Sequence, residues 1–298
     1  MNTLKIIEVG PRDGLQNVPN FVSTEDKIEF INLLSEAGFY EIETSSFVNP
    51  KYIPQLADAV DVFRGIKRNH ATIYSCLVPN INGLKNAFKV RFEKAVFFVA
   101  ASETFNRKNV NMSVDESLQK FKEMAKICKE NNWAIRGSIS TAFVCPFEGT
   151  VSPEKVAKII DVFLSLDVQE ISLCDTFGVI TPKDVERLLG YLVKRYKLSD
   201  FSLHLHNTMG LAMASVYKGF EMGIRCFEAS VGGLGGCPNA PGAAGNLATE
   251  ELVYFFEQMG FKTNVNIDKL IKAAFFIESK LGRPLTSPLI NYYRCSKK

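Results

Sequence analysis

Two histidines of this 298-residue chain, His204 and His206, stand two residues apart at the end of an apolar run that begins at Phe201. The run is typical of a β-strand, in which successive side chains point to opposite faces. Both imidazoles therefore share one face. Two imidazoles placed in this way suit a metal ion, and a pair of hydrogen-bonded interior histidines is the alternative.

Asp13 and Asn246 offer oxygen ligands near the two ends of the same chain. Asp13 follows the first predicted strand, and Asn246 follows the last. If the sheet closes on itself into eight strands, the first, seventh and eighth strands lie next to one another, so the four groups can converge. A mixed set of nitrogen and oxygen ligands without a thiolate favours Mg²⁺ or Mn²⁺, with zinc as the alternative.

Arg12 stands beside Asp13, and Glu43 ends the second predicted strand. Adjacent side chains of an extended chain point apart, so we expect no direct ion pair between Arg12 and Asp13. Arg12 is then free to present its donors to an oxyanion, with Glu43 as the partner that orients it or a ligand. Three other polar side chains at strand ends suit a contact with substrate or with a metal ligand: Ser46, Ser172 and Asp175. For the two serines, structural capping is the alternative.

The segment 231–238 (VGGLGGCP) combines four glycines with Cys237. Glycine permits positive φ angles and close approach of the backbone. A tight turn with an ordinary buried cysteine is one interpretation. The position of the segment after the eighth predicted strand, close to the candidate metal ligands, favours a mobile loop that carries Cys237 into a reaction site.

Short apolar or β-branched runs alternate with helical patterns along the chain, in units of roughly 25 to 35 residues. The strands are predicted at 4–9, 40–44, 71–77, 94–100, 133–141, 169–173, 201–206 and 225–230. Helices are predicted near 24–38, 54–65 and 81–90, from 113, 153 and 182 onward, and near 210–222, 246–259 and 267–281. Eight such units predict a TIM (β/α)8 barrel, whose functional residues lie at the carboxyl ends of the strands. An open doubly wound sheet is the alternative, but no GxGxxG motif follows the first strand.

We predict one catalytic domain, 1–298, with the barrel at about 4–245 and extra C-terminal helices at about 246–285. The net charge of +3 argues against a surface for nucleic acid. No apolar run reaches about 18 residues, so we expect no membrane span. The first residues enter a strand pattern without a targeting segment, and the seven cysteines are dispersed without a CxxC pair. We therefore expect a cytoplasmic protein with reduced thiols.

Five segments together resemble the 3-hydroxy-3-methylglutaryl-CoA lyases of the DRE-TIM metallolyase superfamily. They are 8–17 (EVGPRDGLQN), 42–48 (IETSSFV), 145–149 (CPFEG), 204–206 (HLH) and 233–238 (GLGGCP). The resemblance runs from Lys5 to about the last predicted helix. Three positions depart from the commoner lyase pattern and bear on the choice of substrate: Cys174, Asn207 and Asn239.

The resemblance implies a retro-Claisen lyase that cleaves 3-hydroxy-3-methylglutaryl-CoA to acetyl-CoA and acetoacetate with Mg²⁺ or Mn²⁺. It implies that Arg12 stabilises the enolate of the departing acetyl-CoA and that Cys237 protonates the carbanion. Asp13 and a metal-bound hydroxide are both candidates for the general base. The implied metal ligands are Asp13, His204, His206 and Asn246. The implied further catalytic residues are Glu43 and Asp175, and the implied substrate contacts are Arg12, Gln16, Ser46 and Ser172.

The resemblance also implies an acyl-CoA as partner, a homodimer, and a place in leucine degradation or ketone body formation. Arg107 and Lys108, after the fourth strand, are candidates for contacts with the phosphates of coenzyme A, or else part of a solvated loop. One alternative is an acyl-CoA synthase of the same superfamily, which would carry large C-terminal domains. From another class, the alternative is a non-catalytic metal-binding barrel.

Overall fold

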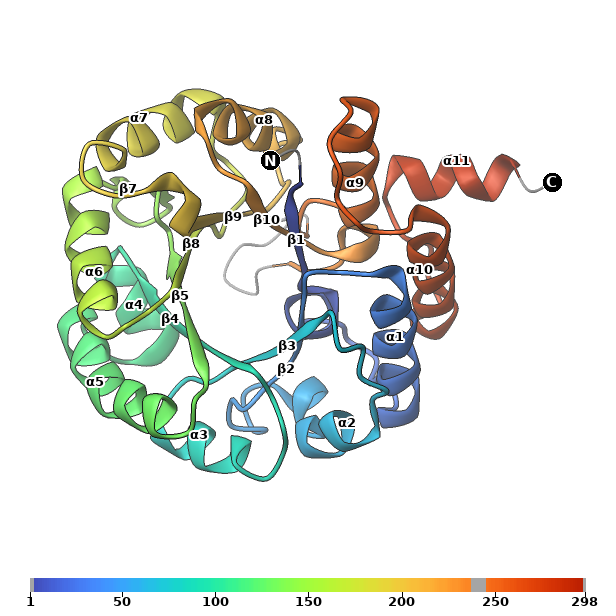
Figure 1. Ribbon diagram of the computed structural model, residues 1–298, viewed down its shortest axis with the longest axis horizontal. Coiled ribbons are helices and arrows are strands. Elements are labelled where there is room, and N and C mark those ends of the chain that lie inside the picture. The colour runs from blue at the N-terminus through green and yellow to red at the C-terminus, as the bar shows by residue number, and fades with distance from the viewer. Residues whose placement is uncertain (1–2, 237–244, 297–298) are drawn as a thin grey trace.

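The computed structural model describes residues 3–236 and 245–296. Eight parallel strands close into a barrel with the helices outside it (Figure 1), in the order β1-β10-β9-β8-β5-β4-β3-β2. The strands are β1 (Lys5–Glu8), β2 (Glu41–Ser46), β3 (Ile73–Leu77), β4 (Lys94–Ala100), β5 (Ala134–Ser140), β8 (Glu170–Asp175), β9 (Phe201–Leu205) and β10 (Cys226–Ala229). Each overlaps a predicted strand, and the predicted TIM barrel is confirmed.

Several of the helices that cover the barrel begin at capping signals of the sequence. Ser113 and Glu116 form a complete capping box at the start of α5, and Ser152 caps α6 ahead of Pro153. The helices are α1 (Thr24–Ala37), α2 (Ala59–Gly65), α3 (Ile81–Ala87), α4 (Glu103–Val110), α5 (Val114–Glu130), α6 (Pro153–Ser165), α7 (Pro182–Leu192), α8 (Ala212–Met222), α9 (Thr249–Gln258), α10 (Ile267–Leu281) and α11 (Pro288–Ser296). Short helical turns are η1 (Gly10–Gly14), η2 (Pro54–Leu56), η3 (Leu198–Asp200) and η4 (Val231–Gly233).

Some elements lie outside the prediction. A hairpin of β6 (Val144–Cys145) and β7 (Gly149–Thr150) has strands of two residues, too short to show a periodic pattern. Helix α4 is mostly polar and buries only Phe105 and Asn106, so it lacks an apolar stripe. Helix α11 lies beyond 285, the predicted end of the C-terminal helices, and among its residues only Ile290 is buried.

Strand alternation separates an apolar shell from a polar barrel interior. On β9, Phe201, Leu203 and Leu205 belong to the main hydrophobic core beneath the helices. Ser202 and His204 alternate with them and are buried on the other face, inside the barrel. The interior therefore holds polar and charged side chains.

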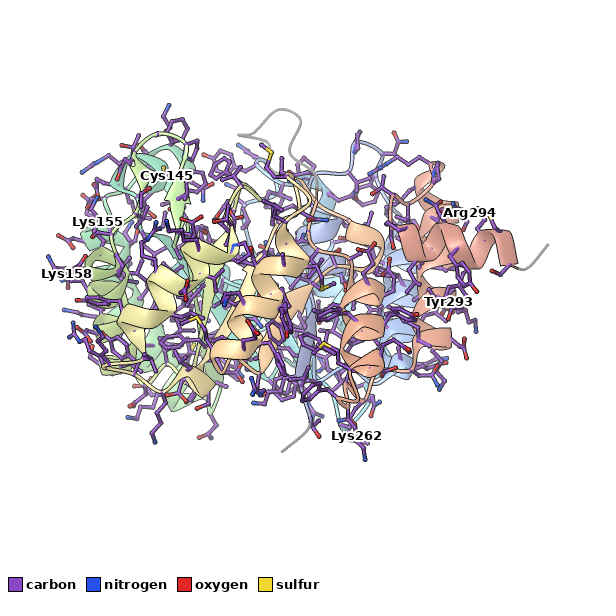
Figure 2. All side chains as sticks on the ribbon, turned by 90° about the horizontal axis from the view of Figure 1, so that it is seen from above. Cys145, Lys155, Lys158, Lys262, Tyr293 and Arg294 are labelled. Carbon is purple, nitrogen blue, oxygen red and sulfur yellow. The ribbon has the colours of Figure 1, made fainter. Side chains whose placement is uncertain are left out.

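The two ends of the barrel are distinct in the side view of Figure 2. Lys262 lies at one end, where its carbonyl accepts the Leu4 N–H, 2.8 Å away, just before β1 begins. Cys145 of the hairpin lies at the opposite end. This second end is the carboxyl end of the strands, where active sites of TIM barrels are built.

Helix α10 packs on the first helix. It lies beside α1 in Figure 1, and an ion pair of 2.8 Å joins Lys280 of α10 to Asp26 of α1. Helices α9 and α11 pack against α10. Within residues 3–236 and 245–296, none of the helices has the length and apolar character that crossing a bilayer requires.

Candidate active site

A tight helical turn follows β1 and carries Arg12 and Asp13. The carbonyls of Val9 and Gly10 accept the N–H groups five residues further on, those of Gly14 and Leu15, at 3.2 and 3.0 Å, which makes η1 a π-helical turn. Such turns are frequent at functional sites. Because the chain is coiled here, the two side chains meet, and Arg12 Nη1 lies 2.6 Å from Asp13 Oδ1. The expectation of no ion pair between them, which assumed an extended chain, is wrong.

Asp13 lies against both histidines at the mouth of the barrel. Its Oδ2 is 3.6 Å from His206 Nε2 and 3.9 Å from His204 Nε2. One potential ligand atom from each of the three residues lies within 4.8 Å of the other two, and all three residues are buried. The predicted convergence of strand ends is confirmed, because β10 pairs with both β1 and β9.

The hydrogen bonds of His204 prepare it for a metal. Its Nδ1 lies 3.0 Å from Glu228 Oε2, so the ring proton belongs on Nδ1 and the lone pair of Nε2 is free. The other oxygen of Glu228 accepts the Ser202 hydroxyl at 2.7 Å. Burial lowers the pKa of His204, but the hydrogen bond and the charge of Glu228 outweigh it and raise that pKa.

Asn246 completes the group but presents its nitrogen. Its Nδ2 donates to Asp13 Oδ2 at 2.7 Å and to the carbonyl of Leu234 at 3.0 Å. Its buried Oδ1 and the buried Nδ1 of His206 have no hydrogen-bond partner among the described residues. A half-turn of the amide exchanges its oxygen and nitrogen and brings an oxygen to the cluster. Two imidazole nitrogens, a carboxylate and an amide oxygen then suit a divalent cation.

The charges inside the barrel also fit a cation. Ion pairs connect five carboxylates with three buried cationic side chains, and the half-exposed Lys5 reaches Glu170 from the rim. With all of them ionised, the carboxylates exceed the three cations inside the barrel by two charges, or by one when Lys5 is counted, and a divalent cation would oppose this excess. The carboxylates are Asp13, Glu41, Glu43, Glu170 and Glu228, and the cations are Arg12, Lys94 and Arg136.

Glu43 orients Arg12, as its position at the end of a strand predicts. Its Oε1 pairs with Arg12 Nε, and its carboxylate is fully buried. Burial alone would raise the pKa of Asp13, but the Arg12 charge and the two histidines hold that pKa well below its usual range. The guanidinium is thus fixed between two carboxylates at the edge of the cluster.

The other predicted site residues divide into two groups. Gln16 belongs to the cluster, since its Nε2 donates to Asp13 Oδ1 at 3.2 Å. Ser172 lies buried inside the barrel, near Glu228. Burial would raise the pKa of Glu228, but the charge of Arg136, the contact with His204 and, least, Ser172 lower it. By contrast, Ser46 accepts the N–H of Val48 at 3.1 Å, and Asp175 accepts those of Phe177 and Ile180 at 3.4 and 3.1 Å. Among the described contacts, the Ser46 and Asp175 side chains hold loops and do not touch the cluster.

Cys237 and Asn239 lie outside the described residues. The part of the glycine segment that is described ends at the mouth of the barrel, where Asn17 Nδ2 donates to the Gly236 carbonyl at 2.7 Å. Gly235 has a φ of 129°, and a Cβ there would lie 2.6 Å from Asn246 Nδ2. Glycine at this position therefore permits both the backbone conformation and the contact with the cluster.

Two buried charges of the site, Glu228 and Arg136, were not predicted. Both stand inside strands, at positions that alternate with outward apolar residues: Ile135 and Gly137 flank Arg136, and Phe227 precedes Glu228. The sequence signal that could have found them is a charged residue at a strand position whose neighbours point outward.

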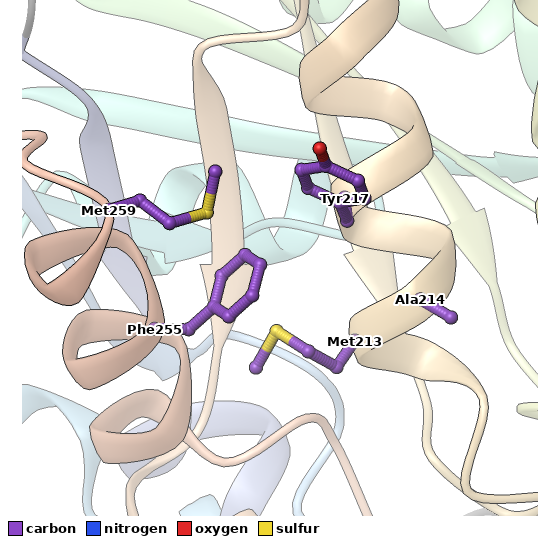
Figure 3. Close-up of a pocket in the computed structure, with 5 residues that line it drawn as sticks. All are labelled: Met213, Ala214, Tyr217, Phe255 and Met259. Carbon is purple, nitrogen blue, oxygen red and sulfur yellow. The ribbon is translucent and has the colours of Figure 1, made fainter.

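A hollow elsewhere on the molecule takes no part in this site. It has a volume of about 390 Å³ and lies between α8 and α9, on the outside of the barrel (Figure 3). Its lining is apolar and holds no metal-ligating side chain: Met213, Ala214, Tyr217, Phe255 and Met259.

A closed (β/α)8 barrel with a buried Asp-His-His cluster at the carboxyl ends of its strands defines a TIM-barrel protein with a candidate metal centre. Comparison with known families narrows the class. The HMGL-like family model matches residues 3–277, and the chain belongs to this family.

Known relatives are similar in sequence and structure over almost the whole chain. A hydroxymethylglutaryl-CoA lyase of Bacillus subtilis is 46% identical over 98% of this chain and 97% of its own. A crystal structure of the Bacillus subtilis HMG-CoA lyase superposes with a TM-score of 0.96 at 46% identity and covers 99% of both chains. The structure of an HMG-CoA lyase from Acinetobacter baumannii, solved with coenzyme A and 3-methylmalate, superposes with a TM-score of 0.93 at 39% identity. The match covers 97% of this chain and 95% of that one.

Proposed function

We propose that this protein is a divalent-metal-dependent lyase that cleaves 3-hydroxy-3-methylglutaryl-CoA to acetyl-CoA and acetoacetate. The observation that carries the proposal is the buried Asp13-His204-His206 cluster beside the fixed Arg12. Its support from relatives is the 46% identity to a lyase of that name over 98% of the chain.

Asp13, His204, His206 and Asn246 would hold the metal, and Mg²⁺ or Mn²⁺ suits their nitrogen and oxygen donors. When bound, the ion supplies Lewis acidity and orientation to the oxygens of the substrate. Glu228 keeps the His204 lone pair available, and Gln16 and Arg12 hold the Asp13 carboxylate.

The chain's own residues account for the movement of charge. A base removes the proton of the tertiary hydroxyl, the carbon–carbon bond breaks, and its electron pair passes into the thioester enolate. Arg12, held by Glu43, provides a positive charge for the enolate oxygen, worth about 3 kcal/mol by analogy with one oxyanion-hole donor. The low pKa of Asp13 makes this carboxylate a weak base for the first step.

Cys237 is the proposed acid that delivers a proton to the carbanion carbon, which completes acetyl-CoA. The glycines before it suit a loop that closes over the site and keeps water from the carbanion. We propose Arg12, Gln16, Ser46 and Ser172 as substrate contacts, and Glu43 and Asp175 as further catalytic residues beside Arg12 and Cys237.

The partner, assembly and cellular setting of the reaction are further parts of the proposal. We propose an acyl-CoA as the small-molecule partner, in line with the coenzyme A bound to the Acinetobacter lyase. We also propose a single catalytic domain, a homodimer, a cytoplasmic location, and a role in leucine degradation or ketone body formation.

A substrate panel tests this function. Purified protein supplied with Mn²⁺ should release acetoacetate from 3-hydroxy-3-methylglutaryl-CoA faster than it cleaves other 3-hydroxyacyl-CoA thioesters, as measured by a coupled assay for acetoacetate. Folded, metal-loaded protein that leaves this thioester intact would refute the proposal.

A further inference from the structure

The buried guanidinium of Arg136 on β5 lies between carboxylates of β2 and a carboxylate of β10. The residue is fully buried, at 0% exposure. Its Nη1 donates to Glu41 Oε1 at 2.8 Å, its Nη2 pairs with Glu43 Oε2, and its Nε lies 4.0 Å from Glu228 Oε1. A single side chain thus interacts with two carboxylates of β2 and one of β10.

Glu43 links Arg136 to Arg12. One oxygen of its carboxylate pairs with Arg136 Nη2, and the other pairs with Arg12 Nε. The carboxylate has 0% exposure, so no water competes for these bonds. The orientation of Arg12 at the mouth of the barrel therefore depends on where Arg136 holds Glu43.

Glu228 links Arg136 to His204 through charge and not through a hydrogen bond, because Arg136 Nε has no hydrogen-bond partner among the described residues. Its Oε2 lies 3.0 Å from His204 Nδ1, while its Oε1 accepts the Ser202 hydroxyl at 2.7 Å and faces Arg136 Nε at 4.0 Å. Partners behind a metal-ligating histidine fix the orientation of its ring. The Arg136 guanidinium therefore contacts the carboxylate that orients His204, a candidate metal ligand, and also the carboxylate that orients Arg12.

We propose that Arg136 is a positioning residue that couples the two halves of the site, since it sets Arg12 through Glu43 and His204 through Glu228. The part of this proposal that concerns Arg12 rests on the proposed function. The part that concerns His204 requires only that the cluster binds a metal.

Arginine is the residue that suits this position. Its planar fork presents several donors at fixed angles, whereas the lysine ammonium is a point charge on a flexible stem. Lys94, another buried cation of the barrel, pairs with Glu41 at 2.6 Å and with Glu170 at 2.5 Å. Among the described ion pairs it reaches neither Glu43 nor Glu228, so it does not substitute for Arg136.

Arg136→Lys tests the coupling in the full-length chain. Mn²⁺ affinity, measured by electron paramagnetic resonance without substrate, should fall about 10-fold, as for partners behind a metal ligand. With Mn²⁺ saturating, kcat should fall while KM changes little, because Arg136 does not touch the substrate. The affinity losses of Arg136→Lys and Glu228→Gln should not add, and neither should the kcat losses of Arg136→Lys and Glu43→Gln.

Lys27→Met is the matched control. Lys27 is also a buried cation, paired with Asp58 at 2.9 Å, but it lies on α1 outside the barrel. Its substitution should lower the melting temperature and leave Mn²⁺ affinity unchanged. The same pattern in Arg136→Lys, with kcat also unchanged, would overturn the proposal and make Arg136 merely structural.

A failure of the variant to fold and a failure of the proposed function can each be distinguished from a failure of the coupling. If Arg136→Lys does not fold, the double variant Arg136→Met with Glu41→Gln removes one charge of each sign and provides the same measurements. A wild-type chain that binds Mn²⁺ but releases no acetoacetate would refute the proposed function, while the Mn²⁺ affinities still test Arg136. A wild-type chain that binds no Mn²⁺ would overturn the coupling as well.

Discussion

Asp13 is the residue on which the candidate site converges. Its carboxylate has contacts from three segments at the barrel mouth, which are the turn after β1, the end of β9 and the segment before α9, and these contacts fix its position. The neighbours are Arg12 at 2.6 Å, Asn246 at 2.7 Å, Gln16 at 3.2 Å, His206 at 3.6 Å and His204 at 3.9 Å. Preorganisation of this kind reduces the reorganisation that binding and reaction require.

A substitution at Cys237 tests the proposed division of labour between metal and acid. Cys237→Ala should lower kcat by about 10²- to 10⁴-fold, since it removes a general acid, while Mn²⁺ affinity stays unchanged. The comparison requires steady-state kinetics and a Mn²⁺ titration of the same preparation. Equal losses in both quantities would show that the cysteine has a structural role.

Individual residues were predicted where alternation along a strand decides their direction. The convergence of Asp13, His204 and His206 follows from strand ends and is confirmed by the structure. The ion pair between Arg12 and Asp13 was not predicted, because no sequence signal distinguishes a π-helical turn from an extended chain at this point.

At the scale of elements, the carboxylate of Glu8 joins three segments around the site. It accepts the N–H of Gly10 at 2.7 Å, that of Val231 at 3.0 Å, and the hydroxyl of Thr249 at 2.7 Å. These residues begin η1, η4 and α9. The turn with Arg12, the glycine segment and the helix after Asn246 are therefore held by one side chain.

The pKa of Glu8 predicts a pH dependence of stability. Burial raises this pKa from 4.5 to about 8, although the N–H and hydroxyl donors lower it. Between about pH 5 and 8 the folded state keeps a proton that the unfolded state has lost, so stability falls as the pH rises, by at most about 1.4 kcal/mol per pH unit. Glu8→Gln mimics the protonated form and should flatten this slope.

Urea unfolding of wild type and Glu8→Gln at several pH values measures the effect. Glu250, whose pKa burial raises to about 7, remains in the variant and keeps part of the slope in the same direction. Identical slopes in the two proteins would contradict the assignment of the titration to Glu8.

Elements with a strong periodic pattern or a cap were predicted, and those without were not. The range of β4, 94–100, was predicted without error, and Ser113 was placed correctly at the start of α5. The β6–β7 hairpin and the polar helix α4 offer neither an apolar stripe nor enough length. Their position depends on contacts with other segments, such as the bond of 2.7 Å from Thr104 N of α4 to Glu148 Oε1 of the hairpin.

At the scale of the whole molecule, closure of the barrel creates the site. β10 pairs with β1 from Lys5–Cys226 to Glu8–Ala229, so groups more than 190 residues apart in sequence lie side by side. The sequence predicts this closure because eight strand–helix units form a TIM barrel. It does not predict the charge balance inside, which depends on the inward direction of residues from several strands at once.

The excess of negative charge predicts that a divalent ion stabilises the whole protein. Binding to the folded state alone adds about 2.7 kcal/mol at an ion concentration 100 times Kd. The melting temperature in Mn²⁺ should therefore exceed that in EDTA by several degrees. The double variant His204→Ala with His206→Ala is the control, and a wild-type shift no larger than its shift would contradict binding at the cluster.

The central claim is that one metal ion at the Asp13-His204-His206 cluster supports lyase activity, and a titration of activity with metal tests it most directly. Protein stripped with EDTA and titrated with Mn²⁺ should regain acetoacetate release from 3-hydroxy-3-methylglutaryl-CoA and reach a plateau at one ion per chain. The His204→Ala variant should need far more Mn²⁺ for any recovery. Full activity in stripped wild type, or the same titration curve for His204→Ala, would contradict the account.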